Sequence, residues 1–198
     1  MIENSLLKDA ENYARKRLSY KRYEHTVRVA ETAGRLAELH DLDTDKARLA
    51  GLLHDASRET YKEGLLRLAE EAGLPIDELE REQAMLLHGP VAAEYACRDL
   101  GVKDSEVLEA VRVHTTGEPG MGPLALAVYV ADKIEPGRNQ PGVEGLRKLA
   151  LKSLHRAARA ALEASISHNE QRGRPTHTKS LQALEWLESP GGKSSSEV

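Results

Sequence analysis

Apolar residues recur three and four positions apart along most of the chain. Behind Ser19, a residue type that caps helices well, Val27, Ala30, Ala33 and Ala37 share one helical face. This spacing predicts a helix rather than a strand, because a half-buried strand needs strict alternation. The same pattern, bounded by capping residues, glycines and prolines, predicts helices over 5–18, 19–40, 45–55, 61–72, 89–99, 105–114, 123–131, 146–171 and 180–187.

One apolar segment, LALAVYVAD at 124–132, could also form a buried strand. Pro123 at its start and the helical pattern around it favour a helix. Abundant Leu and Ala, with no Phe and a single Trp, suit closely packed helices. We therefore predict an all-α fold with a single domain over residues 1–187. The segment 188–198 (ESPGGKSSSEV) is rich in Ser and Gly, which predicts a disordered tail.

Charge and cysteine content exclude several classes of protein. The net charge of -4 and the isoelectric point near 6.1 argue against a protein that binds nucleic acid by bulk electrostatics. No apolar run approaches the ~20 residues that span a bilayer, and charges interrupt the N-terminal segment where a signal peptide is apolar. Cys97, the one cysteine, excludes an intrachain disulfide and a thiolate zinc site. We expect a cytoplasmic protein with neither a membrane nor a nucleic-acid partner.

Polar residues stand at the ends of several apolar segments. The stretch AGLLHDASRE at 50–59 places His54 and Asp55 directly after apolar residues, where an unpaired charge is costly to bury. Similar groups stand at or near the ends of other predicted helices. The full set is His25, His54, Asp55, His88, His114 and Asp132. Helices that each carry one such group can point all of them into the middle of a bundle.

Each of these residues also has an ordinary structural explanation. A single histidine on an apolar face is more often a hydrogen-bonded core residue than a ligand, and Asp55 could cap a following helix through Ser57 or Arg58. Six separate explanations of that kind are needed, whereas one metal site accounts for the whole set. Imidazole and carboxylate together suit Fe, Mn, Zn or Co rather than Mg or Ca. A carboxylate can bridge two such ions ~3.5–4 Å apart, which activate a water for attack at phosphorus.

The order of these residues resembles that of a known family. A histidine early in one helix, a His-Asp pair at the end of the next and a later aspartate resemble the HD superfamily of metal-dependent phosphohydrolases. In this chain the corresponding residues are His25, His54, Asp55 and Asp132. His88 and His114 resemble the subset that binds two metals. The motifs KRYEHTVRVAETA, AGLLHDASRE, LLHGPVAAEYA, VRVHTTGEPGM and VYVADKIEPGR, spread over residues 20–178, are similar to the YqeK-type family of symmetrical bis(5'-nucleosyl)-tetraphosphatases.

The resemblance implies an HD-domain helical bundle with a central dinuclear metal site. It implies one ion held by His25, His54, Asp55 and Asp132, and a second held by His88 and His114 with Asp55 as the bridge. Two transition-metal ions are expected as cofactors, with iron as the family's metal and Mn, Co or Zn as alternatives. The implied reaction is hydrolysis of diadenosine tetraphosphate to two ADP by water, without a cysteine or serine nucleophile.

Asp55 and Arg58 are the residues that we expect to take part in catalysis. Arg58 could bind a phosphate through two N–H groups and stabilise charge in the transition state, or form a solvated salt bridge with Glu59 or Glu63. Glu135 could orient a ligand histidine. The other expected substrate contacts are Thr115, Thr116, Lys133 and Arg138, whose alternative roles are a helix stop and plain surface charges.

Two other functions stay open on the sequence. An HD phosphohydrolase could act on another nucleotide, such as a nucleoside monophosphate, an alarmone or a cyclic dinucleotide; the chain lacks a GYP motif, which weakens the last of these. The domain could also sense a nucleotide without hydrolysing it, although every expected metal ligand is present. A small-molecule nucleotide is the expected partner in each case, and we allow for a homodimer.

Overall fold

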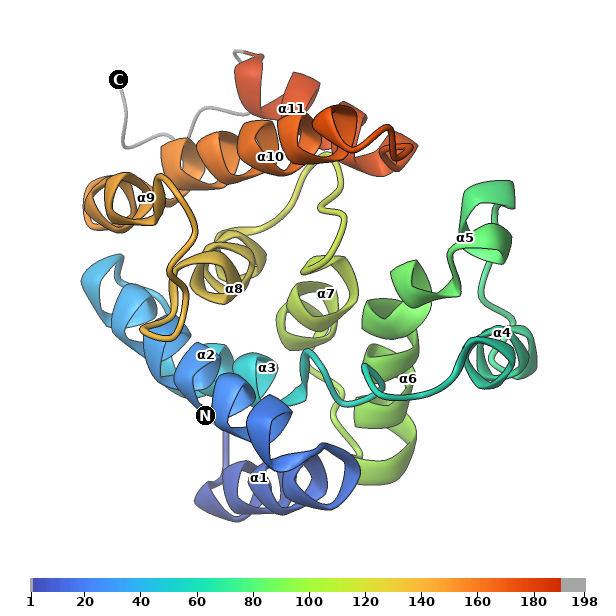
Figure 1. Ribbon diagram of the computed structural model, residues 1–198. Helices are drawn as coiled ribbons and strands as arrows, with labels where there is room; N and C mark the ends of the chain where they lie inside the picture. Colours follow the sequence, from blue (N-terminus) through green and yellow to red (C-terminus); the bar gives the residue numbers. More distant parts are fainter. Residues whose placement is uncertain (1, 190–198) are drawn as a thin grey trace.

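All regular secondary structure is helical in the part of the chain that the computed structural model describes, residues 2–189, which confirms the predicted all-α class (Figure 1). The elements are α1 (Asn4–Arg17), α2 (Tyr20–Leu39), α3 (Thr44–Leu53), α4 (Lys62–Glu71), α5 (Glu78–Glu82), the short 3-10 helix η1 (Ala84–Leu87), α6 (His88–Leu100), α7 (Ser105–Val113), α8 (Pro123–Ile134), α9 (Val143–Ala150), α10 (Leu154–Gln171) and α11 (Thr178–Glu188).

Two parts of this pattern differ from the sequence prediction. The helix expected over 146–171 is two helices, α9 and α10, because the chain turns after Ala150 and the Ser153 hydroxyl caps α10. The sequence pattern does not predict α5, whose start is fixed by a capping box between Asp77 and Glu80. Glu188, the first residue of the predicted tail, closes α11, and positions 190–198 lie outside the described residues.

α8 runs through the middle of the molecule. All of its residues except Pro123 and Lys133 are buried, and α2, α3, α7, α9 and α10 pack around it (Figure 1). A helix that is covered on every side has no need of a polar face. This position explains why the segment 124–132 is continuously apolar until Asp132.

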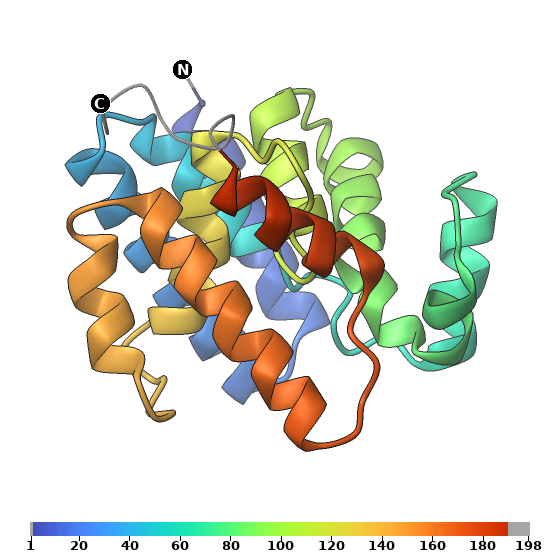
Figure 2. The same ribbon diagram turned by 90° about the horizontal axis from the view of Figure 1, so that it is seen from above.

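The other helices form layers around this centre. α10 and α11 lie side by side over it, and α1 packs below α2 and α3 (Figures 1 and 2). α4 and α5 project at one edge (Figure 2). There α4, η1 and α6 enclose a smaller core of Leu65, Ala69, Leu87, Val91 and Tyr95. Within residues 2–189, no helix combines the length and the apolar character needed to cross a membrane.

Two glycines allow a close approach of the helices that carry the histidines. A Cβ on Gly51 of α3 would lie 2.5 Å from the Cα of Ala30 in α2, and one on Gly89 of α6 would lie 2.7 Å from the carbonyl oxygen of Arg112 in α7. Both helix pairs therefore cross at backbone contact distance, which a side chain would prevent. These crossings bring the first half of α2, the ends of α3 and α7 and the start of α6 to one place.

Candidate metal centre

The residues predicted as metal ligands converge at one buried point. They are His25, His54, Asp55, His88, His114 and Asp132, and all six are buried. His25 and Asp132 lie within α2 and α8. His54 and His114 directly follow α3 and α7, and His88 is the first residue of α6. The fold therefore brings together at the bundle centre the polar groups that the sequence places at or near the ends of helices.

The Asp55 carboxylate lies at the centre of this group. Its Oδ2 is 3.7 Å from His25 Nε2 and 3.4 Å from His54 Nε2. Its Oδ1 is 3.2 Å from His88 Nε2 and 3.8 Å from His114 Nε2. Two ligands of one ion, each about 2.1 Å from it, are roughly 3.0–3.4 Å apart, and the shorter contact of each oxygen falls in this range. The carboxylate therefore faces two candidate metal positions, one with each of its oxygens.

Three of the histidines are oriented by the same local hydrogen bond. Nδ1 of His54 donates to the carbonyl oxygen of Gly51 at 2.7 Å, and Nδ1 of His114 donates to that of Val111 at 2.8 Å. His88 makes the equivalent bond, at 2.5 Å, to the carbonyl three residues before it. Carbonyls at the end of a helix lack intrahelical partners, so a histidine placed there satisfies one of them. This is the local reason why these rings stand where apolar helical runs end.

These bonds fix the tautomer of the three rings, and the tautomer decides whether the rings can bind a metal. A carbonyl oxygen only accepts, so Nδ1 carries the proton and Nε2 of each neutral ring keeps a lone pair. The Nε2 atoms of His88 and His114 are 3.0 Å apart and both face Asp55, whose carboxylate also only accepts. Within residues 2–189, the buried Nε2 atoms of His25 and His54 have no hydrogen-bond partner. Lone pairs gathered in this way need cations between them, so the donor set fits two metal ions.

The surroundings of the centre favour the metal-binding forms of Asp55, His114 and Asp132. Burial raises the pKa of Asp55, but the attraction of His54 and other histidines outweighs it and holds that pKa well below its ordinary value. Burial also raises the pKa of Asp132, but the attraction of Lys133 and other cations outweighs it and holds that pKa well below its ordinary value. Burial and two neighbouring imidazoles lower the pKa of His114 well below its ordinary value. For His54, burial is outweighed by Asp55, which raises the pKa, so a proton competes with a metal ion for its Nε2.

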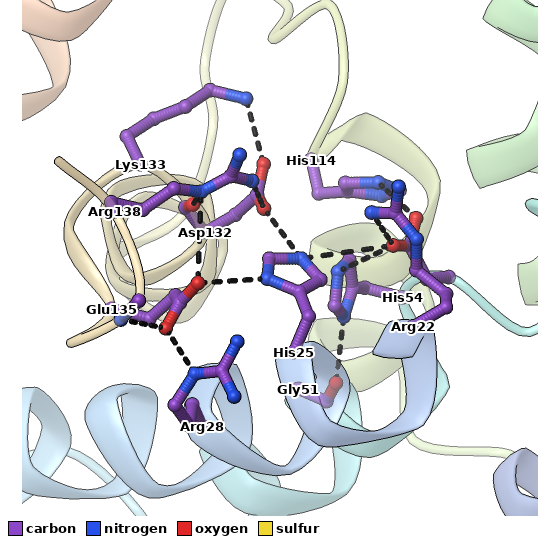
Figure 3. A network of polar contacts seen from close by, with 12 residues as sticks. Arg22, His25, Arg28, Gly51, His54, His114, Asp132, Lys133, Glu135 and Arg138 are labelled. Atoms are coloured by element: carbon purple, nitrogen blue, oxygen red, sulfur yellow. Dashed lines mark hydrogen bonds and ion pairs between the residues drawn. The ribbon is translucent and has the colours of Figure 1, made fainter. Parts of the chain in front are cut away.

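His25 is held between two acids (Figure 3). Its Nε2 is 3.1 Å from Asp132 Oδ1, and its Nδ1 donates to Glu135 Oε1 at 3.1 Å. Glu135 Oε2 accepts a further 2.6 Å bond from Arg28 Nε and another of 2.6 Å from the backbone N–H of Gly137. A carboxylate on the far nitrogen of a ligand histidine fixes its tautomer and orientation. Glu135 thus contacts a candidate ligand as expected, and Arg28 holds that carboxylate from behind.

Replacing Glu135 with Gln should weaken metal binding. A Gln side chain has one acceptor oxygen, so it cannot accept from His25 on one side and from Arg28 and Gly137 on the other. We expect the metal affinity to fall about 10–100-fold, measured by competition with a chelator. Glu144→Gln is the matched control, because the Glu144 side chain is 74% exposed. This variant should bind metal with the affinity of the wild-type protein. Equal affinities of the two variants would contradict the role given to Glu135.

Four cationic side chains line the opening of the centre, a cavity of about 240 Å³. They are Arg22, Arg58, Lys133 and Arg138. Arg22 Nη1 is 3.0 Å from Asp55 Oδ2, and Lys133 Nζ and Arg138 Nη2 are 2.8 and 2.6 Å from the oxygens of Asp132 (Figure 3). The sequence prediction includes all of these cations except Arg22. The signal available for Arg22 was its place three residues before His25, on the same face of one helix.

Of the remaining predicted contacts, Arg58 and Thr115 line this cavity and Thr116 does not. Arg58 forms no ion pair within the described residues, because the Glu59 carboxylate instead accepts from the N–H and the hydroxyl of Ser19. The Thr115 hydroxyl lies 3.1 and 3.2 Å from the Nε2 atoms of two of the histidines. Thr116 borders two neighbouring cavities. A substrate contact through Thr116 stays a prediction from the sequence.

A second group of histidine and acids lies away from this centre, between α11 and α5. His177 Nε2 is 3.1 Å from Asp77 Oδ2 and 3.3 Å from Glu80 Oε1. Here, however, Nδ1 accepts the backbone N–H of Lys179, so Nε2 of the neutral ring carries the proton. A protonated Nε2 that faces carboxylates is a donor and not a ligand. The tautomer therefore distinguishes this link between helices from the candidate metal centre.

Known proteins are similar to this chain over most of its length. The family model described as the HD domain matches residues 22–137, so the chain is an HD-domain protein. The symmetrical bis(5'-nucleosyl)-tetraphosphatase of Bacillus subtilis (strain 168) is 35% identical over 173 residues, which are 87% of this chain and 92% of that protein. The protein of the same name from Staphylococcus aureus (strain NCTC 8325 / PS 47) is 40% identical over 144 residues, 73% of this chain and 74% of that one. The chain belongs to the family of symmetrical bis(5'-nucleosyl)-tetraphosphatases.

A solved structure has the same fold. The crystal structure of a "predicted HD superfamily hydrolase involved in NAD metabolism" from Clostridium acetobutylicum superimposes with a TM-score of 0.88 at 34% identity. The match covers 91% of this chain and 95% of that chain. The shared fold therefore includes the helices on both sides of the metal centre and not the HD segment alone.

Proposed function

We propose that the centre holds two transition-metal ions, one on each side of the Asp55 carboxylate. One ion would be bound by Asp55 Oδ2, His25, His54 and Asp132, and the other by Asp55 Oδ1, His88 and His114. The converging Nε2 lone pairs and the ionised carboxylates support this assignment. Iron is the metal that we propose, and Mn, Co and Zn suit the same nitrogen and oxygen donors.

The protein hydrolyses dinucleoside tetraphosphates symmetrically, converting diadenosine tetraphosphate and water to two ADP. The observation that carries this conclusion is the likeness over most of the chain to two proteins that are named for this reaction. The buried donor set agrees with it, because a pair of metal ions is suited to water attack at phosphorus. The substrate is a polyanion, and the opening of the centre is lined by four cations.

The chain's own residues bind and orient the phosphates in this proposal. When bound, the two ions lower the pKa of a water so that hydroxide is available at neutral pH. Arg58 and Arg22 flank the opening, and each guanidinium can bind two phosphate oxygens at once. Lys133 and Arg138 lie on the side of Asp132 and neutralise the phosphates there. Fixed cations of this kind stabilise the charge that develops on the oxygen between the two middle phosphates.

Hydrolysis of diadenosine tetraphosphate in water enriched in oxygen-18 tests this function. We expect ADP as the only nucleotide product of the metal-loaded protein. One of the two ADP molecules should carry a single labelled oxygen on its terminal phosphate, because water attacks once, at phosphorus. Formation of ATP and AMP would contradict symmetrical cleavage. Tight binding of intact substrate without turnover would favour a nucleotide sensor, and faster hydrolysis of another nucleotide in the same panel would favour a different substrate.

Two further expectations go with this proposal and rest on the sequence. The homodimer and the cytoplasmic location stay predictions, to be checked by light scattering of the purified chain and by cell fractionation.

A further inference from the structure

A large cavity adjoins the candidate metal centre between the segment 138–141 and the second half of α10. Its volume is about 710 Å³, against about 240 Å³ for the opening of the centre itself. A cavity of roughly 300–1,000 Å³ is the usual size of a small-molecule site. None of the residues predicted from the sequence as metal ligands lines it, so the reaction at the centre does not by itself account for this space.

Two cations connect this cavity with the metal centre. Lys133 and Arg138 line both spaces, and both contact the carboxylate of Asp132. A phosphate chain bound at the centre can therefore pass these two side chains and leave the group at its end inside the larger cavity. Along this path the lining changes from the carboxylates of Asp55 and Asp132, through the cations Lys133 and Arg138, to a wall of apolar and polar side chains.

The wall of the cavity suits a flat heterocycle with a polar edge. Its apolar part is Pro141, Leu146, Ala161 and Ala164. Its polar part includes the side-chain amides of Gln140 and Asn169. Small apolar side chains can pack on the faces of a purine, and a side-chain amide carries both the donor and the acceptor that an adenine edge requires.

Two smaller cavities also border residues of the centre. One, of about 270 Å³, is lined by the cations Lys21, Arg22, Arg28 and Arg138 and by the carboxylates of Glu59 and Glu135. The other, of about 210 Å³, lies next to Thr115 under the segment between α10 and α11. Cations outnumber carboxylates in the lining of the first cavity, which suits a phosphate group. Both cavities have less than half the volume of the cavity beside α10. Among these three spaces, the cavity beside α10 has the size and the lining that a nucleoside needs.

We infer that this cavity binds the adenosine of one half of the substrate, whereas the other half is held mainly through its phosphates at Lys21, Arg22 and Arg28. The inference rests on the proposed function. It adds that the two chemically identical halves of the substrate are bound by different sets of contacts. The product ADP should then bind with its adenosine beside α10 and its diphosphate at Lys133 and Arg138. Inorganic pyrophosphate should use the cations alone.

Ala164→Trp provides the test, because it places a large side chain into the cavity from an exposed position of a long helix. Binding of ADP and of pyrophosphate to the metal-loaded full chain is measured by calorimetry. We expect the Kd for ADP to rise at least about tenfold and the Kd for pyrophosphate to stay unchanged. Ala164→Leu should give an intermediate effect on ADP. Glu163→Trp, on the neighbouring position outside the cavity lining, is the matched control and should alter neither constant.

Three results would overturn the inference. Wild-type protein that binds ADP no more tightly than pyrophosphate has no nucleoside site. An unchanged ADP affinity in Ala164→Trp places the nucleoside elsewhere, and an equal loss for both ligands indicates a general disturbance. The wild-type product assay separates this outcome from failure of the proposed function, because ADP binding requires no turnover. Equal melting temperatures of the two Trp variants show that both are folded.

Discussion

Asp55→Asn should bind neither metal ion. Its activity should fall by more than about 100-fold, because loss of a residue that only orients a ligand already lowers metal affinity or activity about 10–100-fold. Each Asp55 oxygen faces its own pair of histidines, so both proposed ions share this one carboxylate. An Asn side chain has no charge, and its NH2 group donates to the Nε2 lone pairs on one side. One candidate position is then closed by hydrogen bonds, and the other keeps its histidines but receives only a neutral oxygen from residue 55.

Metal content per chain and thermal melting are the two measurements for Asp55→Asn. Wild-type protein should gain about 2.7 kcal/mol in stability for each bound ion when the free metal concentration is 100 times the Kd, and the variant should gain none. Asp41→Asn is the matched control, since Asp41 is exposed and lies at a positive φ that Asn also tolerates. A variant that still holds two ions would remove Asp55 from the bridge and would sink the two-ion arrangement.

The convergence of the candidate ligands could be predicted from the sequence because of the way each histidine is placed. His54, His88 and His114 each end an apolar helical run, and each satisfies a carbonyl at a helix end with Nδ1. The same physical requirement therefore produces both the sequence signal and the geometry. The cap proposed for Asp55 is not found, because residues 54–59 form turns and α4 begins only at Lys62.

Other contacts of the centre could not be predicted because they depend on how helices cross. Arg22 reaches Asp55, and Arg28 reaches Glu135, from α2 across to other elements. Their charges look like ordinary surface charges along the chain. Thr116 shows the opposite difficulty. It is adjacent to Thr115 in the sequence and shares one cavity with it, but only Thr115 lines the opening of the centre.

The helix pattern failed in two places for identifiable reasons. Apolar spacing continues through Ala150, Leu151 and Leu154, which hides the break between α9 and α10, although the capping signal of Ser153 was present. α5 is too short and too polar to show periodicity, and its capping box was the one available sign. A capping residue inside a long apolar pattern therefore indicates that a second helix can begin there.

His88→Ala and His114→Ala should each leave one metal ion per chain. Both residues lie on the Oδ1 side of Asp55. Loss of either leaves that side with a single histidine and the shared carboxylate, whereas the Oδ2 side keeps all of its donors. Hydrolysis of diadenosine tetraphosphate should fall by more than about 100-fold, because the paired ions act together on the attacking and the leaving oxygens.

Metal analysis after removal of weakly bound ions with a chelator measures this difference between the two sides of Asp55. His177→Ala is the matched control, because it also removes a buried imidazole but one whose Nε2 carries a proton and faces Asp77 and Glu80. That variant should retain two ions per chain, even where the lost link between α11 and α5 lowers its melting temperature. Two ions in His88→Ala, or one in His177→Ala, would show that hydrogen-bond tautomers do not separate metal ligands from structural histidines in this protein.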